Sequence, residues 1–160
     1  MSAPVVIALG SNLGDRTVYL RRATHRIREA VRIARVSSLF ETEPIDALPG
    51  SPAFLNAIVA GLTDLEPDEL LGFLLSVEGE IGRVRRIRNE ARPIDLDLIL
   101  YDCRLQRSDR LTLPHPRYRG RNFVLEPLRE LRLNWMDPTT GLPFVALKGE
   151  GIVRRVGRLY

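Results

Sequence analysis

The sequence predicts an α+β fold: a ferredoxin-like α/β sandwich in which helices pack on an antiparallel sheet, with a C-terminal extension. Its 160 residues suit one compact domain, and its 44% content of hydrophobic residues is enough for one core. The apolar pattern follows the order strand, helix, strand, strand, helix, strand, which is typical of this sandwich. We therefore expect residues 1–160 to form a single domain with both helices on one face of the sheet.

The first strand and helix are predicted within the first 30 residues. A short apolar run, Val5 to Leu9, ends at Gly10 and predicts a strand. Asp15 is of a type that caps helix N-termini, and apolar residues then recur at helical spacing between arginines. An amphipathic helix is expected to pack on the sheet through Leu20, Ala23, Ile27 and Ala30.

The rest of the chain predicts three further strands, a second long helix and a short one. Residues 33–40, 54–63 and 94–101 are apolar and predict strands, whereas residues 41–52 hold three prolines and a glycine and predict an irregular loop. A helix is expected between Pro67 and Gly82, burying Leu70, Leu74, Val77 and Ile81. A short helix at 122–131 and a Gly- and Pro-rich tail complete the chain.

Composition indicates the cell compartment and the kinds of partner to expect. Charged residues make up 28% of the chain, and no apolar run approaches the roughly 18 residues of a membrane span, so no membrane partner is expected. The N-terminus lacks the basic segment of a secretory signal, and Cys103, the single cysteine, cannot form an intramolecular disulfide, so we expect a cytoplasmic protein. We also expect a monomer. The net charge of +4 favours anionic partners of any kind.

The sharpest local pattern is a pair of aspartates in the strand predicted at 94–101. Residues i and i+2 of a strand point to one face, roughly 6.6 to 7 Å apart, so Asp95 and Asp97 are expected side by side. Mg²⁺ prefers a few carboxylate oxygens together with phosphate oxygens, so this pair suits a magnesium site. An exposed edge strand whose carboxylates pair with arginines is the alternative. The opposite face is expected to fill the core with Leu96, Leu98 and Leu100.

Arginines gather just before this strand, with five between residues 83 and 92. Arginine forks bind phosphate oxygens in bidentate geometry, although a solvated loop or a nucleic-acid patch would give the same cluster. His115 lies between two prolines, and Arg117, Arg119 and Arg121 follow it. We expect His115 to bind phosphate rather than to act as a general acid.

A second strand carries a pattern of another kind. Phe54 and Asn56, again at i and i+2, would place an amide beside an aromatic ring, which suits a flat heteroaromatic ligand. A core phenylalanine and a satisfied buried asparagine would look the same. The segment GSNLG at 10–14 lacks the Gly-Lys-Ser/Thr of a Walker loop, and by itself it predicts only a tight turn.

Four segments, taken in order, resemble one enzyme family. They are GSNLGDR at 10–16, FLNA at 54–57, GRVRRIRNEARPIDLDLIL at 82–100 and LTLPHPRYRGRNFVLEPL at 111–128. Together they resemble the 6-hydroxymethyl-7,8-dihydropterin pyrophosphokinases of folate biosynthesis, and the similarity runs from Val5 to Leu131. Members of that family have a ferredoxin-like fold, transfer pyrophosphate from Mg-ATP to the pterin and release AMP.

The resemblance implies a role for each matching residue. Two Mg²⁺ ions would bind Asp95 and Asp97 and bridge the phosphates of ATP, the co-substrate. Catalytic roles are implied for Arg83, Arg92 and His115, and nucleotide-binding roles for Glu78, Arg85, Arg110, Thr112 and Arg121. The pterin pocket would consist of Thr42, Phe54, Asn56 and Phe123, with the pterin between the two aromatic rings. The loops at 43–53 and 83–93 are expected to be mobile without substrates.

The sequence also departs from the family. Its arginine-rich loop is one residue shorter and lacks the tryptophan that many members carry there, and Phe54 stands where tyrosine is common. These departures leave open a divergent paralogue that acts on a modified pterin. An RNA-binding ferredoxin-like module is a further alternative, but no strand carries the paired aromatics of the RNP1 pattern, so we expect no nucleic-acid partner.

Overall fold

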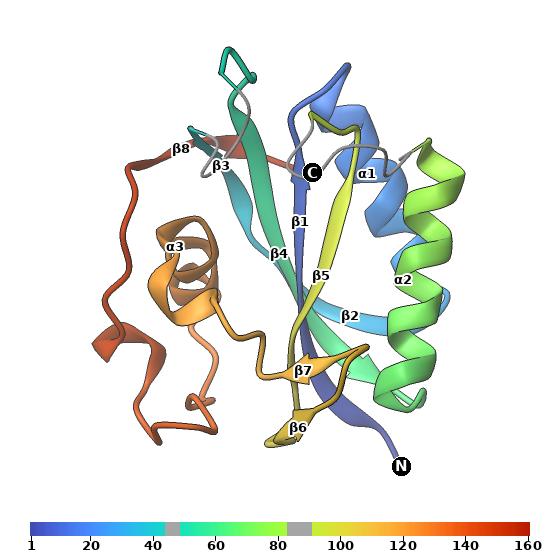
Figure 1. The fold of residues 1–160 in the computed structure, drawn as a ribbon, viewed down its shortest axis with the longest axis vertical. Helices are drawn as coiled ribbons and strands as arrows, with labels where there is room; N and C mark the ends of the chain where they lie inside the picture. The colour runs from blue at the N-terminus through green and yellow to red at the C-terminus, as the bar shows by residue number, and fades with distance from the viewer. Residues whose placement is uncertain (44–48, 83–90) are drawn as a thin grey trace.

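The computed structural model describes residues 1–43, 49–82 and 91–160 (Figure 1). Arg83 and Arg85 lie outside the described residues, and so does most of the two loops expected to be mobile. Among the residues that are described, no helix is long and apolar enough to cross a membrane.

Six strands form one sheet within the described part of the chain (Figure 1). Within this sheet, β1 (Ala3–Ser11) lies between β4 (Phe54–Thr63) and the edge strand β5 (Asp95–Tyr101) and pairs antiparallel with both. Two further strands, β2 (Val31–Val36) and β3 (Ser38–Thr42), pair one after the other along β4. The edge strand β8 (Val153–Arg158) pairs antiparallel with β3 and lies in the Gly- and Pro-rich tail, where no strand was predicted.

The strand predicted over 33–40 is divided at Ser37. The Ser37 N–H donates to the Ile58 carbonyl oxygen at 2.9 Å, and its hydroxyl accepts the Ile58 N–H at 2.8 Å. A side-chain oxygen therefore replaces a backbone oxygen in the ladder at this point, which interrupts the strand without detaching it from β4.

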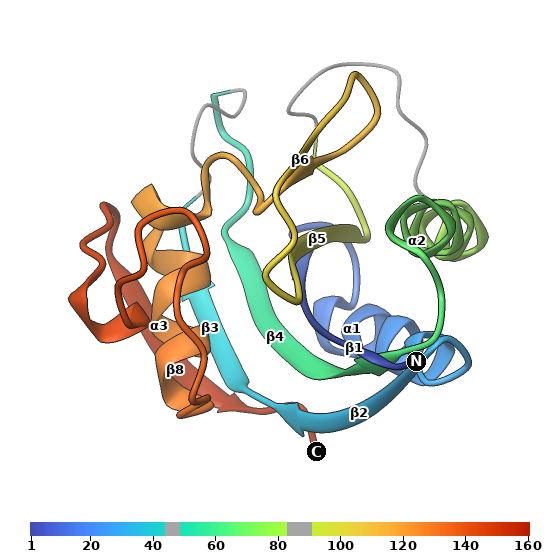
Figure 2. The same ribbon diagram turned by 90° about the horizontal axis from the view of Figure 1, so that it is seen from below.

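Two helices cover one face of the sheet, as predicted (Figures 1 and 2). In α1 (Arg16–Ile27) the Asp15 side chain caps the N-terminus by accepting the Val18 N–H at 3.2 Å. The second helix, α2 (Pro67–Ile81), begins with a proline and ends at Gly82, whose φ of 105° is open to glycine but strained for other residues. Both helices bury the residues expected of them against β1, β4 and β5, except Ala30, which lies in the turn after α1 and is only partly buried. The ferredoxin-like α+β fold is therefore confirmed.

A third helix, α3 (Asn122–Glu130), covers the opposite face of the sheet (Figure 2). It buries Leu125 and Leu128 against Val6 and Ile58, which form a second apolar core. A short hairpin and a 3₁₀ turn lead from β5 to this helix, and a second such turn lies between it and β8. These elements are β6 (Gln106–Arg107), β7 (Thr112–Leu113), η1 (Tyr118–Gly120) and η2 (Phe144–Ala146).

One expectation about β5 is wrong. Leu96 and Leu98 pack under α1 and α2 as predicted, but Leu100 packs in the second core, with α3. The register explains the difference, because Ile7 pairs with Leu98 while Val6 pairs with Leu100, so that Ile99 is an extra residue. A β-bulge of this kind shifts the alternation of side chains beyond it.

Candidate active site

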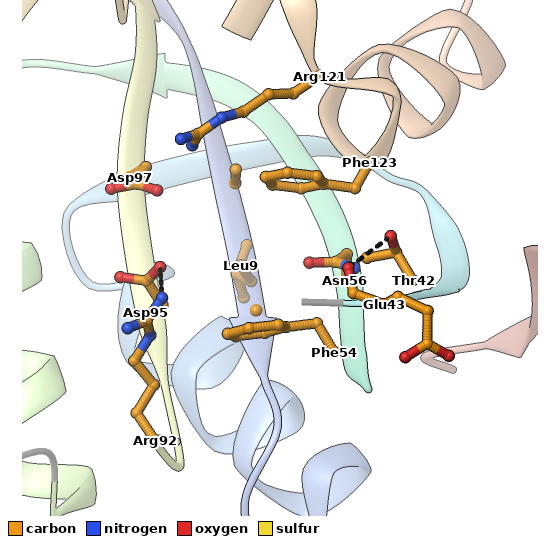
Figure 3. A pocket seen from close by; sticks show the side chains of 12 residues that line it. Leu9, Thr42, Glu43, Phe54, Asn56, Arg92, Asp95, Asp97, Arg121 and Phe123 are labelled. Atoms are coloured by element: carbon orange, nitrogen blue, oxygen red, sulfur yellow. Dashed lines mark hydrogen bonds and ion pairs between the residues drawn. The ribbon is translucent and has the colours of Figure 1, made fainter. Parts of the chain in front are cut away.

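A pocket of about 650 Å³, including its open mouth, lies on the α3 face of the sheet (Figure 3). Its polar and aromatic side chains come from three strands, β3, β4 and β5, from α3, and from the segments that adjoin them. It brings together eight of the residues singled out from the sequence, namely Thr42, Phe54, Asn56, Arg92, Asp95, Asp97, Arg121 and Phe123. Ala8, Leu9, Gly10 and Glu43 also line it and were not predicted.

The floor of the pocket depends on Gly10. This residue pairs with Asn56 on β4 and with Asp95 on β5, so the three occupy one row of the sheet. A Cβ atom at Gly10 would approach Oδ1 of Asn56 to 3.2 Å and a ring carbon of Phe54 to 3.4 Å. Because glycine has no Cβ atom, the side chains of Asn56 and Phe54 can occupy this space.

The aromatic side of the pocket is formed by Phe54 and Phe123. Their rings lie on opposite sides of the space, with Asn56 and Thr42 between them along the wall (Figure 3). The Asn56 amide nitrogen donates to the Phe40 carbonyl oxygen at 3.3 Å, which directs its amide oxygen towards Gly10 and the pocket. Two aromatic faces with a polar edge between them suit a planar ring that carries hydrogen-bonding groups.

The opposite side of the pocket is charged. Asp95 and Asp97 lie next to each other on β5, facing the cavity, as their spacing predicts (Figure 3). No cluster of three or more His, Cys, Asp or Glu side chains suited to a metal occurs in the described residues. A donor set of two carboxylates fits Mg²⁺, which takes its other ligands from phosphates and water.

Among the residues that the structure describes, two arginines line the pocket, and each is associated with an aromatic ring. The guanidinium carbon of Arg92 lies 5.1 Å from the Phe54 ring centre, and that of Arg121 lies 5.4 Å from the Phe123 ring centre. Arg92 also approaches Asp95, with 3.6 Å between nitrogen and oxygen (Figure 3). The cationic groups are therefore held at the boundary between the aromatic and charged sides.

His115 lies close to the charged side, with its backbone N–H donating to the Ile99 carbonyl oxygen at 2.8 Å. Burial, followed by the neighbouring Arg121 and Arg117, lowers the pKa of His115 to about 4, and Asp95 opposes that change. Its Nδ1 accepts the Arg117 N–H at 3.2 Å, so the proton of the neutral ring lies on Nε2. A neutral imidazole with Nε2–H can donate to a phosphate oxygen but is a poor proton donor for acid catalysis.

Several predicted residues lie away from the pocket. Glu78 of α2 is only 2% exposed and accepts the Leu96 N–H at 2.7 Å, beneath the strand that carries the aspartates. Thr112 lies on β7, and the exposed Arg110 precedes it, with a guanidinium nitrogen 3.4 Å from the position a Cβ atom would take at Gly72 of α2. These three residues surround β5 without lining the cavity.

The sequence matches the family described as 7,8-dihydro-6-hydroxymethylpterin-pyrophosphokinase (HPPK) over residues 6–133. The chain belongs to this family. It is 34% identical over 152 residues to the 2-amino-4-hydroxy-6-hydroxymethyldihydropteridine pyrophosphokinase of Aquifex aeolicus, covering 95% of this chain and 94% of that protein. Every predicted pocket residue of the described chain lies within the matched range.

Longer proteins also contain a region like this chain. The folic acid synthesis protein fol1 of Pneumocystis carinii is 38% identical over 139 residues, covering 86% of this chain but 19% of that protein, so the chain spans about a fifth of its length. A crystal structure of HPPK-DHPS in complex with substrates aligns with a TM-score of 0.71 at 13% identity, over 92% of this chain and 43% of that one. This likeness shows a shared fold.

Proposed function

We propose that this protein transfers pyrophosphate from Mg-ATP to 6-hydroxymethyl-7,8-dihydropterin, giving the pterin diphosphate and AMP for folate biosynthesis. Family membership supports the reaction, and the observation that carries it is the row of the sheet in which Gly10 lies between Asn56 and Asp95. A pterin bound beside Asn56 would therefore present its hydroxymethyl group to phosphates bound beside Asp95.

The pterin would bind between the rings of Phe54 and Phe123. Stacking of this kind contributes about 0.5–1.5 kcal/mol for each aromatic pair beyond the burial of area. The Asn56 amide oxygen and the Thr42 hydroxyl would form hydrogen bonds with the polar edge of the pterin. These bonds would distinguish the pterin from other flat rings.

Asp95 and Asp97 would hold Mg²⁺, and we propose two ions. When bound, Mg²⁺ supplies the positive charge that neutralises the phosphate oxygens of ATP and those of the group being transferred. Arg92 and Arg121 would bind the outer oxygens of that group, and His115 would donate its Nε2–H to another. Their main contribution is positioning and charge stabilisation, because phosphoryl-type transfer needs little covalent participation from the protein.

In the transfer itself, the hydroxymethyl oxygen would attack the β-phosphorus in line and the bond from this atom to the α–β bridging oxygen would break. AMP would leave with the bridging oxygen, and the proton of the hydroxyl would pass to water. The nucleoside end of ATP would extend along β5 towards Arg110 and Thr112, and Arg83 and Arg85 are proposed to act on the phosphates. Glu78 would support the site by fixing the backbone of Leu96 between the two aspartates. A cytoplasmic monomer is part of the proposal.

The decisive experiment is chromatography of the nucleotides after incubation with ATP, Mg²⁺ and the hydroxymethyl pterin. AMP formed in equal amount with pterin diphosphate is the expected result. ADP would show ordinary phosphoryl transfer and contradict the proposal. ATP binding without turnover would instead favour a modified pterin as substrate, and a panel of such pterins would identify it.

A further inference from the structure

We infer that Asn12 is a positioning residue that fixes Arg92 relative to the aromatic side of the pocket, an inference that rests on the proposed function. Asn12 belongs to the segment GSNLG, which by its sequence alone predicts only a turn. It follows β1 directly and is 2% exposed, and it does not line the pocket. Any effect on the reaction must therefore pass through its neighbours.

Those neighbours belong to two segments distant in sequence. The Asn12 N–H donates to the Arg92 carbonyl oxygen at 3.1 Å, and the Arg92 N–H donates back to Oδ1 of Asn12 at 2.8 Å. The Nδ2 group of Asn12 donates to the Pro52 carbonyl oxygen at 3.2 Å. One amide side chain therefore joins Pro52, two residues before β4 begins, to Arg92, which leads into β5.

Both segments end in residues of the pocket. Pro52 lies two residues before Phe54, and the Arg92 guanidinium stacks on that same ring while approaching Asp95 at 3.6 Å. Arg16 strengthens the first connection by donating to the Ala53 carbonyl oxygen at 3.1 Å. The separation of the stacking surface from the phosphate-binding cation is thus set by bonds outside the cavity.

The residue type follows from this geometry. The side chain must accept one N–H and donate to one carbonyl oxygen at the same time, in a buried position. Aspartate has no donor for Pro52, serine is too short to reach both partners, and alanine removes both of the side-chain hydrogen bonds that Asn12 makes. Asparagine meets both requirements in the space available.

A positioning role predicts a particular kinetic effect. Phe54, Asn56 and Phe123 are held by β4 and α3, so N12A should leave the KM for the pterin within about threefold of wild type. Arg92 would lose its alignment, so kcat should fall on the order of 10- to 100-fold, as expected for small misplacements of a group that contacts the transition state. Amide hydrogen exchange of Arg92 should become faster in the same variant.

Thr63 offers a matched control at the far end of β4. Its hydroxyl donates to the Ala30 carbonyl oxygen at 2.8 Å and accepts the Leu65 N–H at 3.2 Å, so it also joins two chain segments from a buried position. T63A should lower stability about as much as N12A and leave kcat within about twofold of wild type. A purely structural role for Asn12 would make the two variants alike.

The outcomes separate the inference from the proposed function. Absence of AMP formation by the wild-type protein would overturn the proposed function. An active wild type with equal kcat values for N12A and T63A, or with N12A fully active, would overturn the inference alone. If N12A does not fold, N12D removes the donor to Pro52 and keeps an acceptor for Arg92. A kcat of N12D that falls below that of T63A, as expected for N12A, supports the inference. A kcat of N12D equal to that of wild type overturns it.

Discussion

The guanidinium carbon of Arg92 lies 5.1 Å from the centre of the Phe54 ring, so one side chain contacts both the stacking surface and the charged side of the pocket. Stacking holds the planar guanidinium in one orientation, in which its forked edge can face a phosphate. Lysine can replace the charge at this position but not the flat, forked geometry.

R92K should therefore lower kcat/KM by roughly tenfold, and R92A by roughly 100- to 1000-fold, the range measured for removal of a single charge-stabilising donor. Arg104 provides the control, because its guanidinium carbon lies 5.6 Å from the Tyr101 ring centre, outside the pocket. R104K and R104A should keep wild-type kinetics. An R92K enzyme as active as wild type would show that charge alone suffices.

D97N should abolish Mg²⁺-dependent turnover, with a fall in rate of at least about a hundredfold, because one of two carboxylate ligands loses its charge. Titration of the purified protein with Mg²⁺ and a non-hydrolysable ATP analogue should show weaker binding of both. Asp102 follows the same strand in an exposed turn at φ 50°, which asparagine also adopts readily, so D102N is the matched control. Normal magnesium dependence in D97N would exclude Asp97 as a ligand.

His115 should make stability depend on pH in a definite direction. Its pKa in the folded protein is about 4 against an ordinary value of 6.5, chiefly because of burial, so between these values the unfolded chain binds more protons. The free energy of unfolding should therefore fall as the pH is lowered from 6.5 towards 4. This part of the dependence should be absent in H115N, whose amide oxygen can still accept the Arg117 N–H.

The measurement is urea denaturation of wild type and H115N, without Mg²⁺, at several pH values from 4 to 7.5. The difference in unfolding free energy between the two should shrink, or change in favour of H115N, as the pH falls. Parallel curves over this range would mean that His115 titrates alike in the folded and unfolded chains.

Y118F should destabilise the fold without changing the kinetics. The fully buried Tyr118 hydroxyl donates to the buried carboxylate of Asp137, and burial together with this bond raises the pKa of Tyr118. Removing the hydroxyl leaves the carboxylate with one donor fewer, at a cost of about 1–3 kcal/mol. Y101F is the comparison, because the Tyr101 hydroxyl donates to a neutral backbone oxygen, that of Leu65, at 2.9 Å. Y118F should lose more stability in urea than Y101F. Equal losses would contradict the conclusion that the bond to the buried Asp137 carboxylate contributes more than a bond to a neutral oxygen.

Patterns of short range were the ones that the sequence could reveal. Asp95 with Asp97, and Phe54 with Asn56, share a face because residues two apart in a strand must do so, and the helix between Pro67 and Gly82 follows from spacing and end residues. Four side chains of the pocket, two on β4 and two on β5, are therefore predictable from local spacing alone.

Features that depend on distant partners could not be found in this way. Asn12 bonds to residues 40 and 80 positions away, and no local spacing signals such a pairing. The strand β8, with arginines at half its positions, forms because β3 offers it an unpaired edge. Leu100 faces α3 because the bulge adds a residue that the sequence alternation does not reveal.

The bulge in β5 also connects the segment that carries His115 to the strand that carries Asp95 and Asp97. Ile99, the inserted residue, is the one whose carbonyl oxygen accepts the His115 N–H. Deleting Ile99 would leave a regular strand on which Asp95 and Asp97 keep their side of the sheet, while the segment that carries His115 would lose its anchor. A change in chain length of one residue would thus displace the imidazole from a site whose carboxylates stay in place.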